Sequence, residues 1–202
     1  TVNLIQRYKN TDTKFVFAST CEIFNGATDE GYYPIPTDEQ VPVVFKDIQN
    51  PRWSYSIPKA LSENLVANSG LEYLVIRYFN VYGPGQVDHF INEFVERCKE
   101  GLYYINGNDT RSFCYVDDAV RMTDILVRNH SNTTVNIGNC EEVKIATVAK
   151  MIMGIMGINP DKLQVFGSPK GSATRRCPDT TLVKQLTGFE DYTPLQIGLR
   201  KT

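Results

Sequence analysis

The sequence has no excess of charge and no long apolar run, and each absence removes a class of protein. Its 202 residues carry 21 basic and 23 acidic side chains, so the formal net charge is −2. A balanced chain lacks the basic surface with which proteins bind nucleic acid or anionic membranes. Its apolar stretches, such as residues 151–158, are far shorter than the roughly 20 residues that cross a bilayer. We therefore expect neither a nucleic-acid partner nor a membrane partner.

The sequence also lacks paired cysteine motifs. It has 5 cysteines, an odd number, and none forms a C-x-x-C pair. A domain of this length buries enough apolar surface to fold without disulfides, so reduced thiols in a cytoplasmic protein are expected. The first ten residues show no basic segment followed by an apolar core, so no signal peptide is expected.

Strand-forming and helix-forming segments alternate along the chain. Residues 14–19 and 71–79 are rich in β-branched and aromatic side chains and predict strands buried on both faces. Residues 54–68 carry apolar side chains at helical spacing and end before Gly70. Further helices are predicted at residues 2–8, 90–98, 145–156, 180–186 and 195–200 and from a cap at Asp117 to residue 128, with a short strand at 135–137.

This alternation predicts an α/β fold with a doubly wound, Rossmann-like parallel sheet. Residues 25–52, rich in Gly, Pro, Asp and Gln, predict a long irregular loop of the kind that carries function. Such a fold normally begins with a glycine-rich turn, yet no G-x-G-x-x-G or G-x-x-G-x-x-G occurs here. Either the first half of the fold precedes this sequence, or no dinucleotide binds.

Tyr55 and Lys59 are the first candidate catalytic pair. Four residues apart at the start of a predicted helix, they lie one turn apart on one face. A free phenol, with a pKa near ~10, is a poor base at neutral pH, and a neighbouring ammonium stabilises its phenolate. The same spacing also occurs on ordinary amphipathic surface helices. Thr20 follows the strand at 14–19, where parallel sheets bind ligands, although a strand-end hydroxyl can also simply satisfy backbone groups.

Five segments, in order, resemble motifs of the extended short-chain dehydrogenases that act on nucleotide sugars, the NAD-dependent epimerase/dehydratase family. The patterns are S-T-x-E-V-Y-G, Y-x-x-x-K, R-x-F-N-x-Y-G-P, R-D-F-x-Y-V-D-D and R-x-P-D. The matching segments are FVFASTCEIFNG (15–26), PRWSYSIPKALSENLV (51–66), VIRYFNVYGPG (75–85), DTRSFCYVDD (109–118) and RRCPD (175–179). The resemblance covers nearly the whole chain and implies that the family's N-terminal glycine-loop half is missing from it.

The resemblance implies roles for the catalytic and cofactor-binding residues. Tyr55 would be the acid/base, and Lys59 would hold the nicotinamide ribose and assist Tyr55. Thr20 would bond the reacting sugar oxygen. Ser19 and Tyr78 would lie beside the nicotinamide. NAD is the implied cofactor; NADP stays open, because the residue that selects between them belongs to the missing half.

The resemblance also implies a nucleotide-diphosphate sugar as the substrate. Asn80, Arg111 and Arg176 would approach its diphosphate, for which guanidinium groups are well suited. The alternatives are a turn-forming Asn80 and arginines paired at the surface.

The resemblance also implies a homodimer, with the helices at 2–8 and 54–68 forming the interface.

We predict that residues 1–80 and 112–138 are the remainder of a dinucleotide-binding domain. Residues 81–111 and 139–202 would form a smaller, C-terminal substrate-binding region.

The implied reaction begins with oxidation of the sugar to a transient 4-keto intermediate. Glu22 matches the glutamate of 4,6-dehydratases and UDP-glucuronate decarboxylases, and it is not typical of simple C4 epimerases. The run 51–53 and Arg176 resemble the decarboxylases most, whereas Cys21 stands where these have serine and dehydratases have aspartate. A C4 epimerase, a steroid-type dehydrogenase and a non-catalytic sugar-nucleotide-binding or dimerisation fragment remain alternatives.

Overall fold

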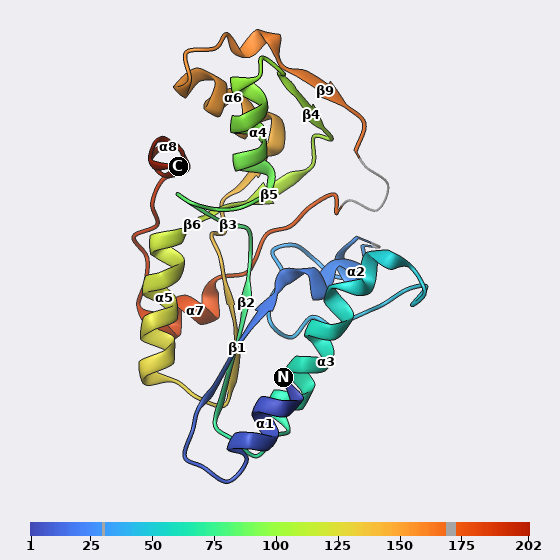
Figure 1. The fold of residues 1–202 in the computed structure, drawn as a ribbon, viewed down its shortest axis with the longest axis vertical. Helices are drawn as coiled ribbons and strands as arrows, with labels where there is room; N and C mark the ends of the chain where they lie inside the picture. Colours follow the sequence, from blue (N-terminus) through green and yellow to red (C-terminus); the bar gives the residue numbers. More distant parts are fainter. Residues whose placement is uncertain (30, 169–172) are drawn as a thin grey trace.

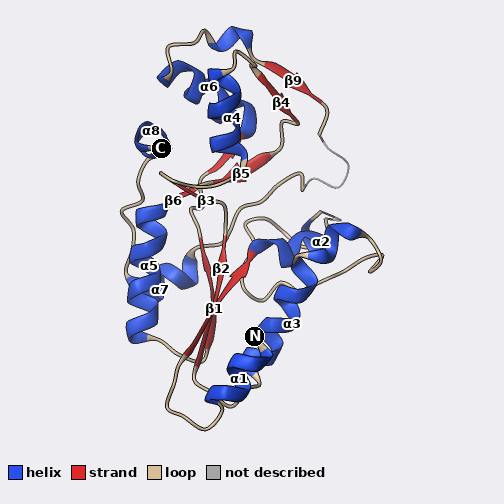
Figure 2. Ribbon diagram, viewed as in Figure 1, coloured by secondary structure: helices blue, strands red, loops and turns tan. Residues whose placement is uncertain are grey.

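The computed structural model describes residues 1–29, 31–168 and 173–202. Its centre is a parallel sheet of β1 (Phe15–Thr20), β2 (Tyr73–Tyr78) and β7 (Thr133–Ile137), in the order β1-β2-β7 (Figure 2). Thr20 pairs with Tyr78, which pairs with Ile137, so the three strands end at one edge. The predicted α/β fold with a parallel sheet is therefore confirmed.

Helices cover both faces of this sheet (Figure 1). On one side, α3 (Ser56–Ala67) packs on β1 and β2, and α1 (Val2–Tyr8) lies alongside α3. On the other side, α5 (Val116–Asn129) and α7 (Thr181–Thr187) pack on β2 and β7. The helices predicted at these positions are thus confirmed to within a few residues.

The core beneath α5 and α7 explains why these segments form helices. The completely buried side chains Met122 and Leu126, one turn apart on α5, meet Leu74 and Ile76 of the central strand. The prediction that Asp117 caps α5 was wrong. Tyr115 is the N-cap, and Asp117 lies in the first turn, where its carboxylate faces the positive end of the helix dipole.

A second group of elements lies beyond the carboxyl edge of the sheet. It consists of α4 (Phe90–Lys99), α6 (Ile145–Ile155) and α8 (Leu195–Lys201) with three strand pairs, β3 (Val81–Tyr82) with β6 (Cys114–Tyr115), β4 (Tyr104–Asn106) with β9 (Gln164–Phe166), and β5 (Thr110–Ser112) with β8 (Glu142–Lys144). The sequence did not predict these six strands, because segments of two or three residues are too short to show the alternation of apolar and polar side chains that identifies a strand.

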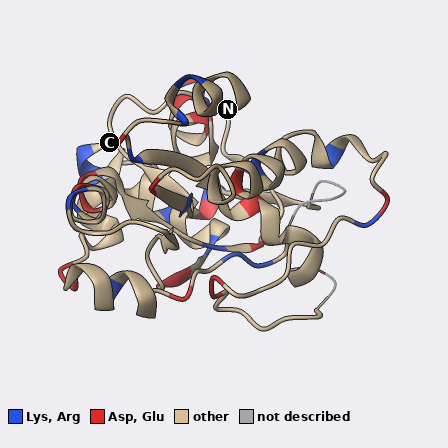
Figure 3. Cartoon of the chain, turned by 90° about the horizontal axis from the view of Figure 1, so that it is seen from below, with Lys and Arg blue, Asp and Glu red and all other residues tan. Residues whose placement is uncertain are grey.

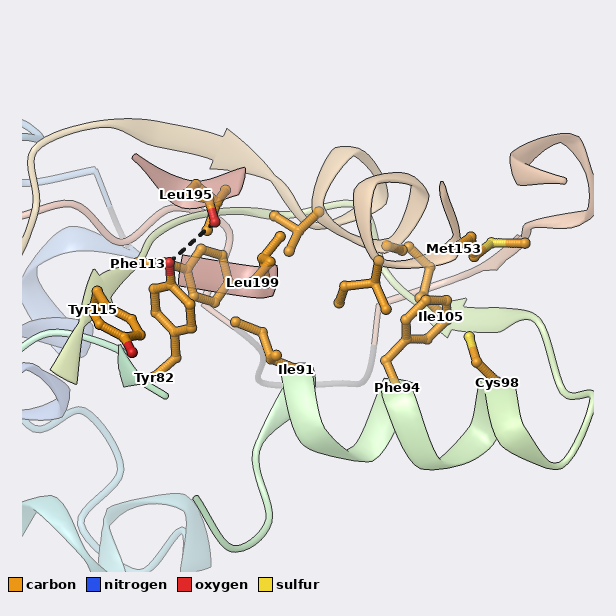
Figure 4. Packing of buried hydrophobic residues seen from close by; sticks show 13 residues of the cluster. Tyr82, Ile91, Phe94, Cys98, Ile105, Phe113, Tyr115, Met153, Leu195 and Leu199 are labelled. Atoms are coloured by element: carbon orange, nitrogen blue, oxygen red, sulfur yellow. Dashed lines mark hydrogen bonds between the residues drawn. The ribbon is translucent and has the colours of Figure 1, made fainter. Parts of the chain in front are cut away.

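An aromatic core joins the helices of this second group (Figure 4). Tyr82 contacts Phe113 and Tyr115 edge to face, and its hydroxyl donates to the Leu195 carbonyl at 3.3 Å. A side chain at Gly198 would collide with that hydroxyl, so α8 can approach only through a glycine. The core fixes the wall of the cleft described below.

The long predicted loop is only partly irregular. A 3₁₀ turn at Cys21–Phe24 runs into the short helix α2 (Asn25–Thr28), and a second 3₁₀ turn at Pro51–Ser54 leads into α3. Between these turns, Thr37 pairs with Pro178, so the loop lies against the segment that carries Arg176. Both turns were missed because four residues are too few to show a helical pattern.

The predicted division of the chain into two regions stays a prediction. The helix α7 falls in the part assigned to substrate binding, yet it packs on β7 of the sheet.

Acidic and basic residues are interspersed along the chain in Figure 3. Within the described residues, no helix combines the length and apolarity needed to cross a membrane.

Candidate active site

A cleft of about 880 Å³ opens at the carboxyl edge of the sheet. Its floor comes from the ends of β1 and β2 and the start of α3, and its far wall comes from the second group of elements. All nine residues that the sequence singled out line this one cleft: Ser19, Thr20, Glu22, Tyr55, Lys59, Tyr78, Asn80, Arg111 and Arg176. The structure therefore brings together residues that are up to 157 positions apart in the sequence.

Helix α3 presents Tyr55 and Lys59 to the cleft. The Lys59 ammonium donates to the Ala18 carbonyl at 2.7 Å and lies 5.7 Å from the centre of the Tyr55 ring. The 3₁₀ turn that precedes α3 is capped by Asn50, whose side chain accepts from the Arg52 amide at 3.0 Å. This cap and the sheet contact together hold the phenol at the mouth of the cleft, where 52% of Tyr55 is exposed.

Thr20 and Glu22 enter the cleft from the turn after β1. The Thr20 hydroxyl accepts from the Glu22 amide at 3.3 Å, so it caps the 3₁₀ turn. The Thr20 hydroxyl therefore does bond to a backbone group at the strand end, which is the alternative role that the sequence suggested for it. A hydroxyl that accepts one bond still has a proton to donate, so this role leaves its bond to a substrate oxygen possible.

Arg176 and Glu22 form an ion pair in the cleft. One guanidinium nitrogen of Arg176 lies 3.2 Å from the Glu22 carboxylate and donates to the Asn25 side chain at 3.3 Å. The Nε atom of Arg176 is buried and has no hydrogen-bond partner among the described residues. A buried donor without a partner is costly, which makes this side of the cleft suited to an acceptor from a ligand.

A second guanidinium, that of Arg111, lies close enough to Arg176 for the Arg176 charge to affect its pKa. Burial lowers the pKa of Arg111, and the Arg176 cation lowers it further. Burial also acts to lower the pKa of Arg176, but Cys21, Glu22 and Asp29 raise it by more. Two cations in one partly buried region disfavour each other, so an anion bound there would gain from both.

The thiol of Cys21 lies beside these charges. Burial raises the pKa of Cys21, against the lowering effect of Arg176. The side chain is thus held as a neutral thiol, a weak hydrogen-bond donor. It cannot supply the carboxylic acid that an aspartate would offer at the same position.

We expect only one thiol of the described chain to react readily with iodoacetamide. Cys140 is exposed, whereas Cys21, Cys98, Cys114 and Cys177 are buried. Burial raises the pKa of both Cys114 and Cys177 to about 12, which removes the nucleophilic thiolate at neutral pH. Mass spectrometry of the folded protein should show Cys140 labelled first. Equal labelling of Cys21 would contradict the burial of that thiol at the wall of the cleft, and denaturant should expose all five as the control.

Three predicted residues line the cleft while their polar groups bond to protein. The Ser19 hydroxyl donates to Glu63, and the Tyr78 hydroxyl lies 3.0 Å from the Thr123 hydroxyl. Asn80 adopts a positive φ of 37° and donates to the Ser112 carbonyl at 2.9 Å, which is the turn-forming role considered for it. Their predicted contacts with nicotinamide or diphosphate stay predictions.

Sequence reasoning missed the far wall of the cleft. This wall includes Gln86, His89, Phe90, Asn106, Asp109 and Phe113. Asp88 and His89 take positive φ angles of 61° and 64° just before α4, a costly conformation that clusters at functional sites. Asp109 and Phe113 lie inside a recognised motif, which was a usable signal. The others lie in segments without one.

The residues at the floor of the cleft fit one end of NAD. An ammonium and several hydroxyl groups surround the ends of β1 and β2, and such donors and acceptors suit a ribose and a carboxamide. The fit concerns the nicotinamide end, since no glycine-rich phosphate-binding motif occurs in the 202 residues.

The parallel sheet, its covering helices and a Tyr-x-x-x-Lys pair at its carboxyl edge are the arrangement of the short-chain dehydrogenase fold. Residues 1–138 match the model of the NAD dependent epimerase/dehydratase family. The chain therefore belongs to this family, as its motifs predicted, and NAD is the cofactor in the family's own description.

Three relatives illustrate the likeness. A UDP-N-acetyl-alpha-D-glucosaminuronate decarboxylase of Bacillus cytotoxicus is 31% identical over all of this chain and 66% of its own length. UDP-glucuronic acid decarboxylase 1 of Xenopus tropicalis is 28% identical over all of this chain and 49% of its own. The structure of a UDP-glucose 4-epimerase from Thermotoga maritima with UDP-glucose is 27% identical, with a TM-score of 0.84 over all of this chain and 66% of its own. The chain thus spans about half to two thirds of these proteins.

Proposed function

We propose that the complete protein is an NAD-dependent enzyme that decarboxylates a nucleotide-diphosphate uronic acid through a 4-keto intermediate. The observation that carries this proposal is the Glu22–Arg176 ion pair in the same cleft as Thr20, Tyr55 and Lys59. The two decarboxylases among the relatives support the choice of reaction. The family's dehydratases and epimerases share the first step, so the choice among the reactions rests on the groups that surround C5 and C6 of the sugar.

The first step is oxidation of the sugar at C4. Tyr55 takes the proton of the C4 hydroxyl, with the Lys59 ammonium beside it to stabilise the phenolate. Thr20 donates a hydrogen bond to the same oxygen and orients it. Bound NAD⁺ would accept the hydride from C4 and return it in the last step, so the cofactor is regenerated.

The resulting 4-keto sugar with a carboxylate on C5 is a β-keto acid. The C5–C6 bond breaks, CO₂ leaves, and the electron pair forms an enolate between C5 and the C4 oxygen. The protonated Tyr55 and Thr20 stabilise that oxygen. A proton from solvent then adds to C5, and Tyr55 returns its proton to the C4 oxygen when the ketone is reduced. We assign Arg176 to this carboxylate, rather than to the diphosphate that the motif implied for it, because it pairs with Glu22 at 3.2 Å. The negative charge of Glu22 disfavours the carboxylate and so favours its loss as neutral CO₂.

Dehydration has less support at this site. Loss of the C6 hydroxyl needs an acid at the leaving oxygen and a base at C5. The group beside Glu22 is the Cys21 thiol, whose raised pKa makes it a weak acid. Arg176 would also have no anion at C6 to hold. The cleft is therefore better suited to a uronic acid than to a neutral hexose.

The test is to supply the complete protein and NAD with UDP-glucuronate, UDP-N-acetylglucosaminuronate or UDP-glucose. We expect CO₂ and a UDP-pentose-type product from a uronate, followed by NMR. A 4-keto-6-deoxy product from UDP-glucose would instead make it a dehydratase, and a retained carboxylate with inverted C4 would make it an epimerase. No turnover of any of the three would contradict the enzymatic proposal.

We also propose that the protein is a homodimer through α1 and α3. The two helices are joined by a hydrogen bond of 3.0 Å between the Thr1 and Ser62 hydroxyls. No residue of α1 is buried, and Leu4 and Leu61 are 52% and 58% exposed. Apolar side chains on two adjacent helices suit an isologous four-helix contact.

Leu61→Asp is expected to convert the dimer to a monomer in analytical ultracentrifugation. A charge at the centre of an apolar contact is desolvated without a partner, which costs several kcal/mol. Val120→Asp is the matched control, because Val120 is 59% exposed on α5, across the sheet. A parent that sediments as a monomer at micromolar concentration would contradict the proposal.

A further inference from the structure

A second charged cluster lies behind the cleft, where the proposed mechanism does not use it. Glu63 of α3 and Arg77 of β2 are both buried. The Arg77 guanidinium contacts the Glu63 carboxylate through Nη2 at 2.7 Å and Nε at 3.0 Å. A buried ion pair of this kind is expensive to desolvate, and an apolar pair often serves stability as well. Its presence therefore calls for a role other than stability.

The position of Glu63 on α3, relative to the catalytic residues, indicates what that other role is. Glu63 follows Lys59 by four residues, as Lys59 follows Tyr55, so the three side chains lie on one face of α3 and its preceding turn. Lys59 is bonded to the Ala18 carbonyl, and Glu63 accepts from the Ser19 hydroxyl. Two successive turns of the helix are thus tied to two successive residues at the end of β1, next to Thr20.

We propose that Glu63 and Arg77 are positioning residues, which hold α3 in register with β1 so that Tyr55 and Lys59 face Thr20. The proposal rests on the proposed function, because it assigns the pair to the same catalytic group. Arg77 supplies the fixed point: it belongs to the central strand, which is buried on both faces. Glu63 transmits that position to the helix and, through Ser19, to the strand end.

The same arginine also contacts the loop that follows α2. Arg77 donates to the Glu39 carbonyl at 3.0 Å, and the Glu39 carboxylate accepts from the Asn136 amide at 2.8 Å. Two residues earlier, the Thr37 carbonyl accepts from the Asp179 amide at 2.8 Å. The loop anchored by Arg77 therefore pairs with the segment that carries Arg176. Displacement of Arg77 would therefore affect the acid/base group and the carboxylate-binding group together, whereas loss of the Glu63 charge leaves the bond from Arg77 to Glu39 in place.

Glu63→Gln in the complete protein tests the proposal. Glutamine keeps the length and an acceptor for Ser19 but removes the ion pair. We expect kcat to fall on the order of a hundredfold, as for a misplacement of about 1 Å, with KM changed far less. The pH profile of kcat should also change, because the Lys59 ammonium no longer lies as close to the phenol.

Two further variants separate positioning from stability. Val66→Ala, which opens a cavity in the same helix at a completely buried side chain, should lower Tm but leave kcat and the pH profile unchanged. The double variant Glu63→Gln/Arg77→Met removes the unpaired cation and should regain Tm while kcat stays low. Recovery of kcat together with Tm, or an unchanged profile in Glu63→Gln, would overturn the proposal.

A readout that needs no turnover keeps this proposal distinct from the proposed function. The rate at which an acylating reagent modifies Lys59 reports its bond to Ala18, and mass spectrometry measures that rate. It should rise in Glu63→Gln and in the double variant, and stay at the parent value in Val66→Ala. An inactive parent with this pattern contradicts only the proposed function. An active parent with equal rates in all variants contradicts only the positioning role.

Discussion

Tyr55→Phe is expected to lower kcat in the complete protein by about 10²–10⁴-fold, the range for loss of a general acid/base. The substitution removes only the hydroxyl. The ring stays at the mouth of the cleft, with the Lys59 ammonium 5.7 Å from its centre. Because the ring is half-exposed, we expect little change in Tm. Binding of the nucleotide sugar should also persist, so the loss should appear in kcat.

Calorimetry of substrate binding, steady-state rates and thermal unfolding together check this prediction. Tyr32→Phe is the matched control, since Tyr32 is 61% exposed and is not among the residues that line the cleft. A kcat within about twofold of the parent would remove Tyr55 from the proton-transfer step. It would favour the binding or dimerisation role that the sequence left open.

The sequence was most informative where one segment carried its own signal. The run Leu74–Ile76 is completely buried at the centre of the sheet, and its unbroken apolar character predicted that position. Tyr55 and Lys59 became candidates through a spacing that also occurs on ordinary surface helices, and the family motif then implied their roles. The site residues that came from motifs all line one cleft, because the carboxyl ends of parallel strands meet at one edge.

Features that depend on contacts between distant segments were missed. Glu63 looked like an ordinary helix residue, and its partner Arg77 lies on a strand whose other side chains are aliphatic or aromatic. No local pattern says that the two meet, or that Ser19 joins them. Thr37 and Pro178 are 141 positions apart, and only the folded chain shows that their segments pair.

Glu22→Gln is expected to separate oxidation of the sugar from the loss of CO₂. Glutamine keeps the size of the side chain and a carbonyl acceptor for Arg176, but it removes the negative charge beside the proposed carboxylate site. Without that charge, Arg176 holds the substrate carboxylate as a stable ion pair, and its release as CO₂ is no longer favoured. The 4-keto intermediate and reduced cofactor should therefore accumulate.

Absorbance of NADH and release of CO₂ measure the two steps in one reaction. We expect NADH to form at close to the parent rate and CO₂ release to fall on the order of a hundredfold. Glu190→Gln, an exposed carboxylate outside the cleft, serves as the control. Glu22 is itself about one third exposed, so loss of its ion pair should cost little stability compared with a fully buried pair. Unchanged CO₂ release in the variant would remove Glu22 from the reaction. A parent protein that inverts C4 without losing carbon would show that Thr20, Tyr55 and Lys59 suffice, as in a C4 epimerase.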